Sequence, residues 1–284
     1  MNAFASFVLL FSTTVTANAW RYTGSQGQCN CSSTSFSKCV DELASQSCKV
    51  LKFAGNAVQG TIPSSIGSLT GVTAVDIFNC DLTGTIPPSL GSLGNGTLTR
   101  LNLENGQLTG VLPGNLLPSP TLHMLNINNQ QLTGSIPTTW FEDSSPLLTN
   151  LTLNTQRLAG TIPNTLSAST LPKLLRFSVA SNVLSGTMPS SLGSLSTLQY
   201  FSISNNILSG AIPDSFSSLT SARYFYVGDN MISGTWPDFI CDLPLASTDG
   251  SACSLQPGFL ECPMPTSCSD YKTRCDLECQ YYPE

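Results

Sequence analysis

The chain has 284 residues, of which only 10% are charged, and its formal net charge at pH 7 is -6. Its 11 basic residues are scattered, so it lacks the cationic stripe that a phosphate backbone requires, and we exclude nucleic acid as an expected partner. The sequence contains neither a glycine-rich phosphate loop nor a metal-ligand spacing, and we therefore expect no cofactor.

The first 19 residues have the pattern of a secretory signal peptide. An apolar run from Phe4 to Phe11 precedes Ala17-Asn18-Ala19, which matches an A-x-A cleavage site, so the mature chain is predicted to begin at Trp20. The run is too short to span a bilayer, no other segment approaches the required length, and the C-terminus lacks the hydrophobic tail of a GPI signal. We expect a secreted, extracellular protein, with association to a cell wall as an option.

Ten of the 11 cysteines gather near the two ends of the chain. Even numbers of cysteines in a secreted protein predict disulfide-stapled caps, and the absence of histidine near either group disfavours zinc. We predict five disulfides confined to the caps, while the remaining cysteine, Cys80, is expected to be a free, buried thiol. The pairing within each cap stays open. The two groups are Cys29, Cys31, Cys39 and Cys48, and Cys241, Cys253, Cys262, Cys268, Cys275 and Cys279.

The middle of the chain consists of eight repeats. The pattern leucine-x-glycine-x-isoleucine-proline, abbreviated LxGxIP, returns at a spacing of 24 or 26 residues, with another apolar residue in place of the leucine or isoleucine in four repeats. Each repeat begins with apolar residues at alternating positions, as in Leu101-Asn102-Leu103, which is the pattern of a β-strand. A strand and a turn that recur together at this period indicate leucine-rich repeats. The repeats have their prolines at Pro63, Pro87, Pro113, Pro137, Pro163, Pro189, Pro213 and Pro237.

The repeats resemble the plant-type extracellular leucine-rich repeat family, whose unit reads LxxLxxLxLxxNxLxGxIPxxLGxL. The segment from Phe201 to Pro213, FSISNNILSGAIP, is a close match. Polygalacturonase-inhibiting proteins and receptor-kinase ectodomains share this repeat. The resemblance implies an α/β solenoid, a leucine-rich repeat superhelix with a concave parallel β-sheet, a second strand in each LxGxIP segment and short 3-10 helices on the convex side.

Strand alternation predicts the same sheet without the family. In Leu101-Asn102-Leu103 the leucines point inward and Asn102 points outward. No single repeat can bury its apolar face alone, so the repeats stack and the ends need caps. We predict a monomer with a signal peptide at 1–19, an N-terminal cap at 20–47, eight repeats at 48–240 and a C-terminal cap at 241–284.

One position of the repeat normally holds an asparagine whose amide bonds the backbone of adjacent coils. Here this ladder is interrupted in the middle of the chain, where we expect altered turns. Its positions are occupied by Asn56, Cys80, Gly106, Gln130, Gln156, Asn182, Asn206 and Asn230.

The outward side of the concave sheet is the first candidate binding surface. Aromatic residues gather at its C-terminal end, where Tyr200, Tyr224 and Tyr226 lie near Arg176, and tyrosine and arginine are enriched in interface hot spots. Alternatively, these tyrosines cover the junction with the C-terminal cap. The candidate residues are Asp76, Phe78, Arg100, Asn102, Glu104, Asn126, Arg176, Tyr200, Tyr224 and Tyr226.

The LxGxIP strands form a second candidate surface, which we term the flank. Both x positions are expected to project outward while the glycine and the apolar residues point inward, which gives an uncharged rank rich in hydroxyls. Such a rank resembles ice-binding solenoids, and some members of this repeat family bind ice. The preference of threonine for half-exposed strands explains much of the rank without any function. The candidate residues are Thr61, Thr83, Thr85, Thr133, Ser135, Thr161, Ser185, Thr187, Ser233 and Thr235.

Catalysis is not expected. The single histidine, His123, stands at a strand edge with no acid or nucleophile fixed near it in sequence, so a catalytic triad lacks its base. Asp76 and Glu104 face the concave side at a diagonal separation of roughly 8 Å, which is the range of inverting glycosidases. An open sheet, however, offers no closed pocket that would raise the pKa of one carboxyl group.

Three sequons, at Asn30, Asn95 and Asn150, predict N-glycosylation, and Asn150 is expected to face the concave side. The sequence therefore predicts a secreted, non-enzymatic leucine-rich repeat protein that binds an extracellular protein or a cell-wall polysaccharide. The resemblance to polygalacturonase inhibitors suggests recognition or defence, and ice binding by the flank is the alternative.

Overall fold

The computed structural model describes residues 35–44, 48–55, 58–94, 96–235, 237–246, 253–254 and 259–261, the last two segments by their backbone alone. Several predictions lie outside these residues. They concern the signal peptide at 1–19, the sequons Asn30 and Asn95, the ladder position Asn56, and the cysteines Cys29, Cys31, Cys262, Cys268, Cys275 and Cys279.

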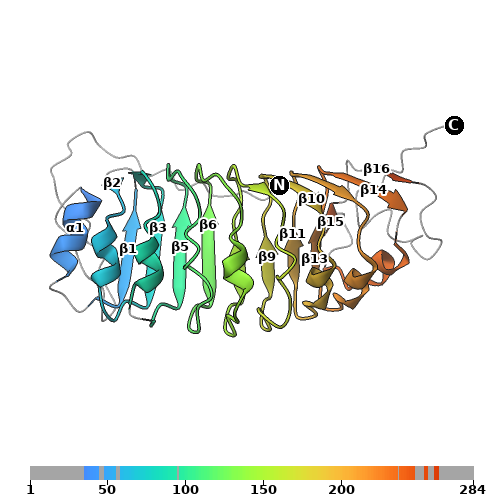
Figure 1. The fold of residues 1–284 in the computed structure, drawn as a ribbon, viewed down its shortest axis with the longest axis horizontal. Helices are drawn as coiled ribbons and strands as arrows, with labels where there is room; N and C mark the ends of the chain where they lie inside the picture. Colours follow the sequence, from blue (N-terminus) through green and yellow to red (C-terminus); the bar gives the residue numbers. More distant parts are fainter. Residues whose placement is uncertain are drawn as a thin grey trace, which may run out of the picture.

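One long parallel sheet runs the length of the solenoid (Figure 1). Apolar residues alternate with polar ones in each strand, so one face of the sheet is buried and the other is open. Within the described residues the sheet has nine strands in chain order: β1 (Val50–Ala54), β3 (Ala74–Phe78), β5 (Arg100–Glu104), β6 (Met124–Asn128), β7 (Asn150–Thr152), β9 (Arg176–Ser178), β11 (Tyr200–Ser202), β13 (Tyr224–Tyr226) and β15 (Cys253–Ser254).

The LxGxIP segments form the expected second layer of strands, along the upper edge of the solenoid in Figure 1. Isolated bridges link Thr85 to Thr109 and Val111 to Thr133 in the gap between the two sheets of this layer. The first sheet pairs β2 (Gln59–Thr61) with β4 (Asp81–Thr83), and the second contains β8 (Ala159–Gly160), β10 (Val183–Thr187), β12 (Ile207–Gly210), β14 (Met231–Thr235) and β16 (Phe259–Glu261).

Short helices complete most coils. Each 3-10 helix follows directly on the proline of an LxGxIP segment, because proline cannot continue the strand ladder. The 3-10 helices are η1 (Ser64–Ser68), η2 (Pro88–Ser92), η3 (Thr138–Phe141), η4 (Ser190–Ser194), η5 (Asp214–Ser218) and η6 (Asp238–Asp242). At the N-terminal end, α1 (Phe36–Leu43) buries Phe36 against Phe53, with ring centroids 4.8 Å apart, and so covers the first coil.

The core between the layers is a single stack of leucine, isoleucine and aromatic side chains. Phe177, Phe201 and Phe225 occupy equivalent strand positions and stack with centroid distances of 6.0 and 5.2 Å. Trp140 is fully buried, and its indole Nε1–H donates to the carbonyl oxygen of Pro113 at 2.9 Å. The indole therefore fills the core and also pairs a backbone group of the preceding coil.

The asparagine ladder is more complete than the sequence predicts. Asn206 donates to the carbonyl oxygens of Val179 and Ile203, and its Oδ1 accepts the Leu184 N–H at 3.0 Å. The same acceptor role is kept in the middle of the chain by longer amides, because Gln130 Oε1 accepts the Leu108 N–H at 3.0 Å and Gln156 Oε1 accepts the Leu132 N–H at 3.3 Å.

Gly106 explains how the longer amide of Gln130 is accommodated. A Cβ at Gly106 would lie 2.7 Å from Gln130 Oε1, so the glycine leaves room for this side chain in its present position. The expectation of altered turns throughout the middle was therefore wrong where glutamine replaces asparagine. The amide bonds are replaced at Gln130 and Gln156, whereas neither Gly106 nor Cys80 carries an amide.

The described cysteines agree with the predicted division of roles. Cys39, Cys48 and Cys241 are disulfide-bonded, whereas Cys80 is free and buried. Burial raises the pKa of the Cys80 thiol to about 11, so it stays protonated at neutral pH and is a poor nucleophile. The pairing of the cap cysteines and the total of five disulfides stay predictions.

Candidate functional site

The concave surface has the residue columns that the repeat spacing predicts. Arg176 aligns with Tyr200, and Tyr200 aligns with Tyr224, on neighbouring strands. Asn150 aligns with Arg176 on the other side, so this sequon does face the concave surface. Equivalent residues of successive repeats therefore lie side by side on this sheet.

A compact aromatic cluster occupies the C-terminal end of the concave surface. The ring centroid of Tyr200 lies 5.7 Å from that of Tyr224 and 5.5 Å from that of Tyr226, and the latter two lie 6.4 Å apart. The guanidinium carbon of Arg176 lies 3.9 Å from the centre of the Tyr200 ring, which is a cation–π contact. Burial first, and then the neighbouring Tyr200 and Tyr224, raise the pKa of Tyr226, so its hydroxyl stays neutral well into the alkaline range.

This tyrosine cluster, Tyr200, Tyr224 and Tyr226, lies next to the C-terminal region. Strand β13 pairs with β15, and the Ala246 N–H donates to the carbonyl oxygen of Arg223 at 2.9 Å. The cluster therefore borders the C-terminal region and is also part of the concave surface. Tyr224 nevertheless keeps 36% of its surface exposed, so the junction does not bury the cluster completely.

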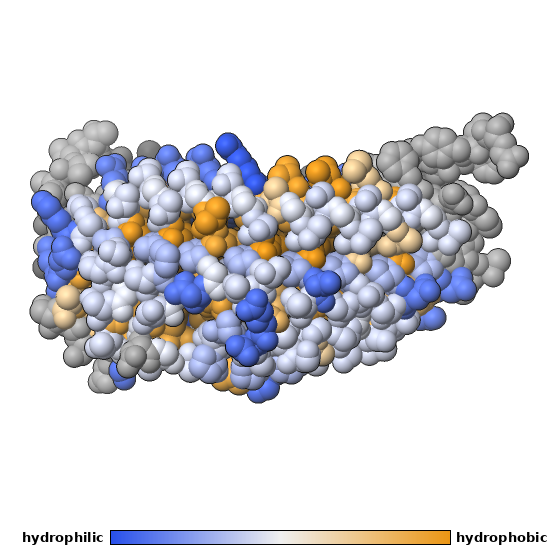
Figure 2. Space-filling model, in the orientation of Figure 1, coloured by the Kyte–Doolittle hydropathy of each residue, from blue (hydrophilic) through white to orange (hydrophobic). Residues whose placement is uncertain are grey.

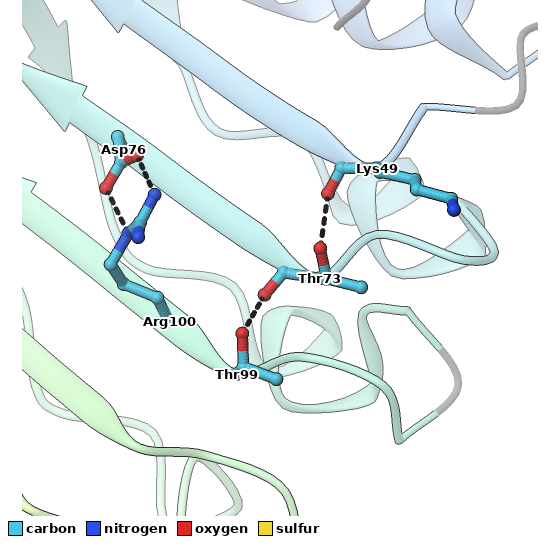
Figure 3. A network of polar contacts seen from close by, with 5 residues as sticks. All are labelled: Lys49, Thr73, Asp76, Thr99 and Arg100. Atoms are coloured by element: carbon cyan, nitrogen blue, oxygen red, sulfur yellow. Dashed lines mark hydrogen bonds and ion pairs between the residues drawn. The ribbon is translucent and has the colours of Figure 1, made fainter. Parts of the chain in front are cut away.

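The N-terminal end of the concave surface is charged and internally paired (Figure 3). Arg100 donates from Nε and Nη2 to the two carboxylate oxygens of Asp76, at 2.8 and 2.6 Å. The hydrogen bond to Asp76 raises the pKa of Arg100, and the Lys52 ammonium lies 5.6 Å from the centre of the Phe78 ring. Both carboxylate oxygens of Asp76 are therefore engaged by Arg100.

Between the two ends, polar side chains bond to one another. The hydroxyl of Thr152 donates to Asn126 Oδ1 at 2.8 Å and accepts from Asn128 Nδ2 at 3.1 Å. In the next coil, the Ser178 hydroxyl donates to Asn154 Oδ1 at 2.7 Å. Only Asn126 of this network was a candidate from sequence, although asparagine, serine and threonine at neighbouring outward positions were a signal for the rest.

The single histidine of the chain belongs to no cluster of metal-binding side chains among the described residues. His123 is exposed, and its Nδ1 lies 2.8 Å from the carbonyl oxygen of Thr121. Within the described part of the chain, no three histidine, cysteine or acidic residues come together in a way that could hold a metal ion. A search of the same residues finds no helix that is long and apolar enough to cross a membrane.

The flank strands do not pair with equivalent residues side by side, as simple stacking of the repeats predicts. Ser185 pairs with Ile207, although Val183 is the residue that corresponds to Ile207 in the preceding repeat. Likewise Ser209 pairs with Met231. Each flank strand is therefore shifted by two residues against its neighbour, so the row of hydroxyls runs obliquely across the flank.

Neighbouring coils hold the flank side chains in place. At the first x, hydroxyls donate to the glycine carbonyl of the preceding coil at 3.2 to 3.4 Å, as from Thr133 to Gly110 and from Ser185 to Gly160. At the second x, the methyl group packs against the glycine of the following coil. Gly186 has φ +79°, and a Cβ there would lie 2.9 Å from Thr161 Cγ2, so the bare glycine faces this methyl group and does not simply point inward as expected.

An apolar row that was not among the sequence candidates extends the flank in its C-terminal half. The residue before each LxGxIP leucine is Val183, Ile207 or Met231 in three successive coils, with exposed fractions of 47%, 47% and 48%. Earlier coils carry Gln131 or Arg157 at this position. Figure 2 shows hydrophobic side chains on the upper edge above β10, beside hydrophilic ones over the earlier coils.

Known proteins share this architecture. A leucine-rich repeat family model matches residues 71–93 and 197–219. No curated protein sequence matches the chain. The ectodomain of the Arabidopsis receptor kinase HAESA, solved with an N-terminally extended IDA peptide hormone ligand, is 28% identical with a TM-score of 0.58, over 76% of this chain and 38% of that chain.

Two further solved structures are similar in fold. The plant peptide hormone receptor RGFR1, in complex with RGF2, is 24% identical with a TM-score of 0.66, over 82% of this chain and 40% of that chain. A plant ice-binding protein is 24% identical with a TM-score of 0.60, over 75% of this chain and 68% of that chain. The matched region thus spans only about two fifths of either receptor ectodomain, at 40% and 38%. With eight consecutive repeats and this fold, the chain is a leucine-rich repeat solenoid that is similar to the plant-type extracellular family.

Proposed function

We propose that this protein is a secreted, monomeric, non-enzymatic recognition protein that binds an extracellular protein or a cell-wall polysaccharide through the C-terminal half of its concave surface. The tyrosine cluster beside Arg176 carries the proposal, because rigid aromatic rings and arginine dominate interface energetics. The similarity to HAESA, whose ectodomain was solved with a peptide hormone ligand, supports a ligand-binding role. A role in cell-wall recognition or defence fits this surface.

Replacing Tyr226 with alanine is expected to weaken binding of a captured partner by about 2 kcal/mol, or roughly 30-fold, because it removes the ring that contacts both other tyrosines. Partners would be captured from extracellular extracts on the purified protein, identified by mass spectrometry and titrated by calorimetry. Tyr226→Phe keeps the ring and serves as the control. An unchanged dissociation constant for Tyr226→Ala, with a normal melting temperature, would move the binding site elsewhere.

The flank supports ice binding as a second candidate function. Its side chains carry no charge at either x position from Thr61 to Thr235, and the hydroxyl bonds and methyl–glycine contacts hold them in fixed orientations. Side chains that are already ordered lose little entropy when they contact a lattice of water. The apolar row of Val183, Ile207 and Met231 adds exposed methyl groups to the same face.

If ordered water is the ligand, the purified protein should shape ice crystals and inhibit their recrystallisation. Thr161→Lys combined with Thr187→Lys places two charges in the rank and should abolish both effects, because a solvated ammonium group cannot be accommodated in a flat ice contact. Thr165→Lys combined with Thr220→Lys changes exposed threonines away from the flank and should have no effect. Round crystals at millimolar wild-type protein, identical to those in buffer, would remove this candidate.

A further inference from the structure

Among the described side chains, Arg176 is the one charged residue at the outward positions of the concave surface from β6 to β13. From β6 to β13, the outward positions hold Met124, Asn126, Asn128, Asn150, Thr152, Asn154, Arg176, Ser178, Ala180, Tyr200, Ser202, Ser204, Tyr224, Tyr226 and Gly228. A lone positive charge in a neutral surface is unusual for a chain of net charge -6. None of these outward positions from β6 to β13 holds an acid.

The other arginine of the same column provides the contrast. Arg100 is neutralised by the two hydrogen bonds to Asp76. No described residue forms an ion pair or a hydrogen bond with the Arg176 side chain, which instead lies on the Tyr200 ring. Stacking uses the face of the guanidinium and leaves its N–H groups in the plane, where they can bind a carboxylate through two parallel bonds.

The polar residues around Arg176 favour a protein ligand over a polysaccharide. Thr152 bonds to both Asn126 and Asn128, and Asn154 accepts from Ser178, so the amide oxygens of Asn126 and Asn154 already accept hydrogen bonds and are less available to sugar hydroxyls. A chain of acidic sugars would also bring repeated carboxylates toward Glu104 and the net negative charge of the protein. A single acid within a largely uncharged protein contact suits one arginine beside three tyrosines.

We infer that Arg176 is the anchor for one aspartate or glutamate side chain of a protein partner, held between the Arg176 guanidinium and the tyrosine cluster. This inference rests on the proposed concave binding function and specifies its ligand. Tyr200 orients the guanidinium, and the incoming carboxylate replaces the water around its N–H groups. The same contact rejects partners with a lysine or arginine at that point, because two cations would meet.

Random 12-residue peptides displayed on phage and selected on the immobilised protein would test this inference. Selected peptides would be synthesised with blocked ends, and their dissociation constants measured by calorimetry. We expect one shared aspartate or glutamate, whose amide analogue binds at least tenfold more weakly to the wild type but equally to Arg176→Gln. Arg223→Gln removes one exposed positive charge at the edge of the same sheet and should leave binding unchanged.

Three results would overturn the inference. The first is a selection that returns no peptide above background, and the second is a set of selected peptides that lack an acid. The third is that trigalacturonate binds more tightly than any peptide and that Arg176→Gln loses this binding, which would assign an acidic sugar as the ligand. If Tyr226→Ala weakens peptide binding while Arg176→Gln does not, the concave site stands and the role of Arg176 is wrong. If neither variant changes binding, the concave site itself fails.

Discussion

Replacing Trp140 with alanine is expected to lower the free energy of unfolding by about 3–5 kcal/mol, which is the usual cost of removing a large buried aromatic side chain. The indole is fully buried in η3, and its Nε1–H donates to the Pro113 carbonyl oxygen at 2.9 Å. The variant therefore leaves both a cavity and an unpaired carbonyl between two coils. Urea unfolding followed by circular dichroism would measure the loss.

Trp140→Phe separates these two contributions. It keeps most of the apolar volume but removes the hydrogen bond to Pro113, so we expect a smaller loss of about 1–3 kcal/mol. A Trp140→Ala protein that is as stable as the wild type would mean that adjacent coils collapse into the space and that the core between η3 and the long sheet is not closely packed.

Replacing Asn206 with alanine is expected to cost about 2–4 kcal/mol, because a buried amide that bonds two coils disappears. Its Nδ2 donates to Val179 and Ile203 carbonyl oxygens at 3.0 and 2.9 Å, and its Oδ1 accepts the Leu184 N–H at 3.0 Å. The buried Leu184 N–H would lose its acceptor, whereas the Val179 and Ile203 carbonyl oxygens would each keep one amide donor, from Asn182 and Asn230. Hydrogen exchange measured by mass spectrometry should show faster exchange for Leu184 and its neighbours.

Asn164→Ala provides the matched control, since Asn164 is exposed in the coil after Pro163 and should tolerate the same change within about 0.5 kcal/mol. Equal effects of the two substitutions would mean that the ladder contributes no more than any surface asparagine. In that case the stability of the solenoid would come from leucine packing alone.

The register of the long sheet could be predicted from the repeat spacing. Once Arg176, Tyr200 and Tyr224 occupy equivalent positions, parallel stacking without offset places them side by side, and the structure has them so. The flank could not be predicted in the same way. Its two-residue shift, as in the pairing of Ser185 with Ile207, is a register between strands that the repeat pattern does not encode.

Substitutions in the ladder and in the concave surface show a second limit. Gln130 reads as a break in the asparagine column, yet its longer amide keeps the acceptor role because Gly106 in the preceding coil leaves space. The bonds among Asn126, Thr152 and Asn128 likewise depend on rotamers and not on spacing. The apolar row that begins at Val183 was visible in the sequence, but it lay one position before the motif that drew attention to the flank.

The location of the bound partner is tested most directly by hydroxyl-radical footprinting of the complex, read out by mass spectrometry. The concave surface and the flank carry reactive probes of similar exposure, because Tyr224 is 36% exposed on the former and Met231 is 48% exposed on the latter. We predict that a protein partner protects Tyr224 and Tyr226 from oxidation while Met231 is oxidised as in the free protein. Protection of Met231 with unchanged oxidation of both tyrosines would contradict binding at the concave surface.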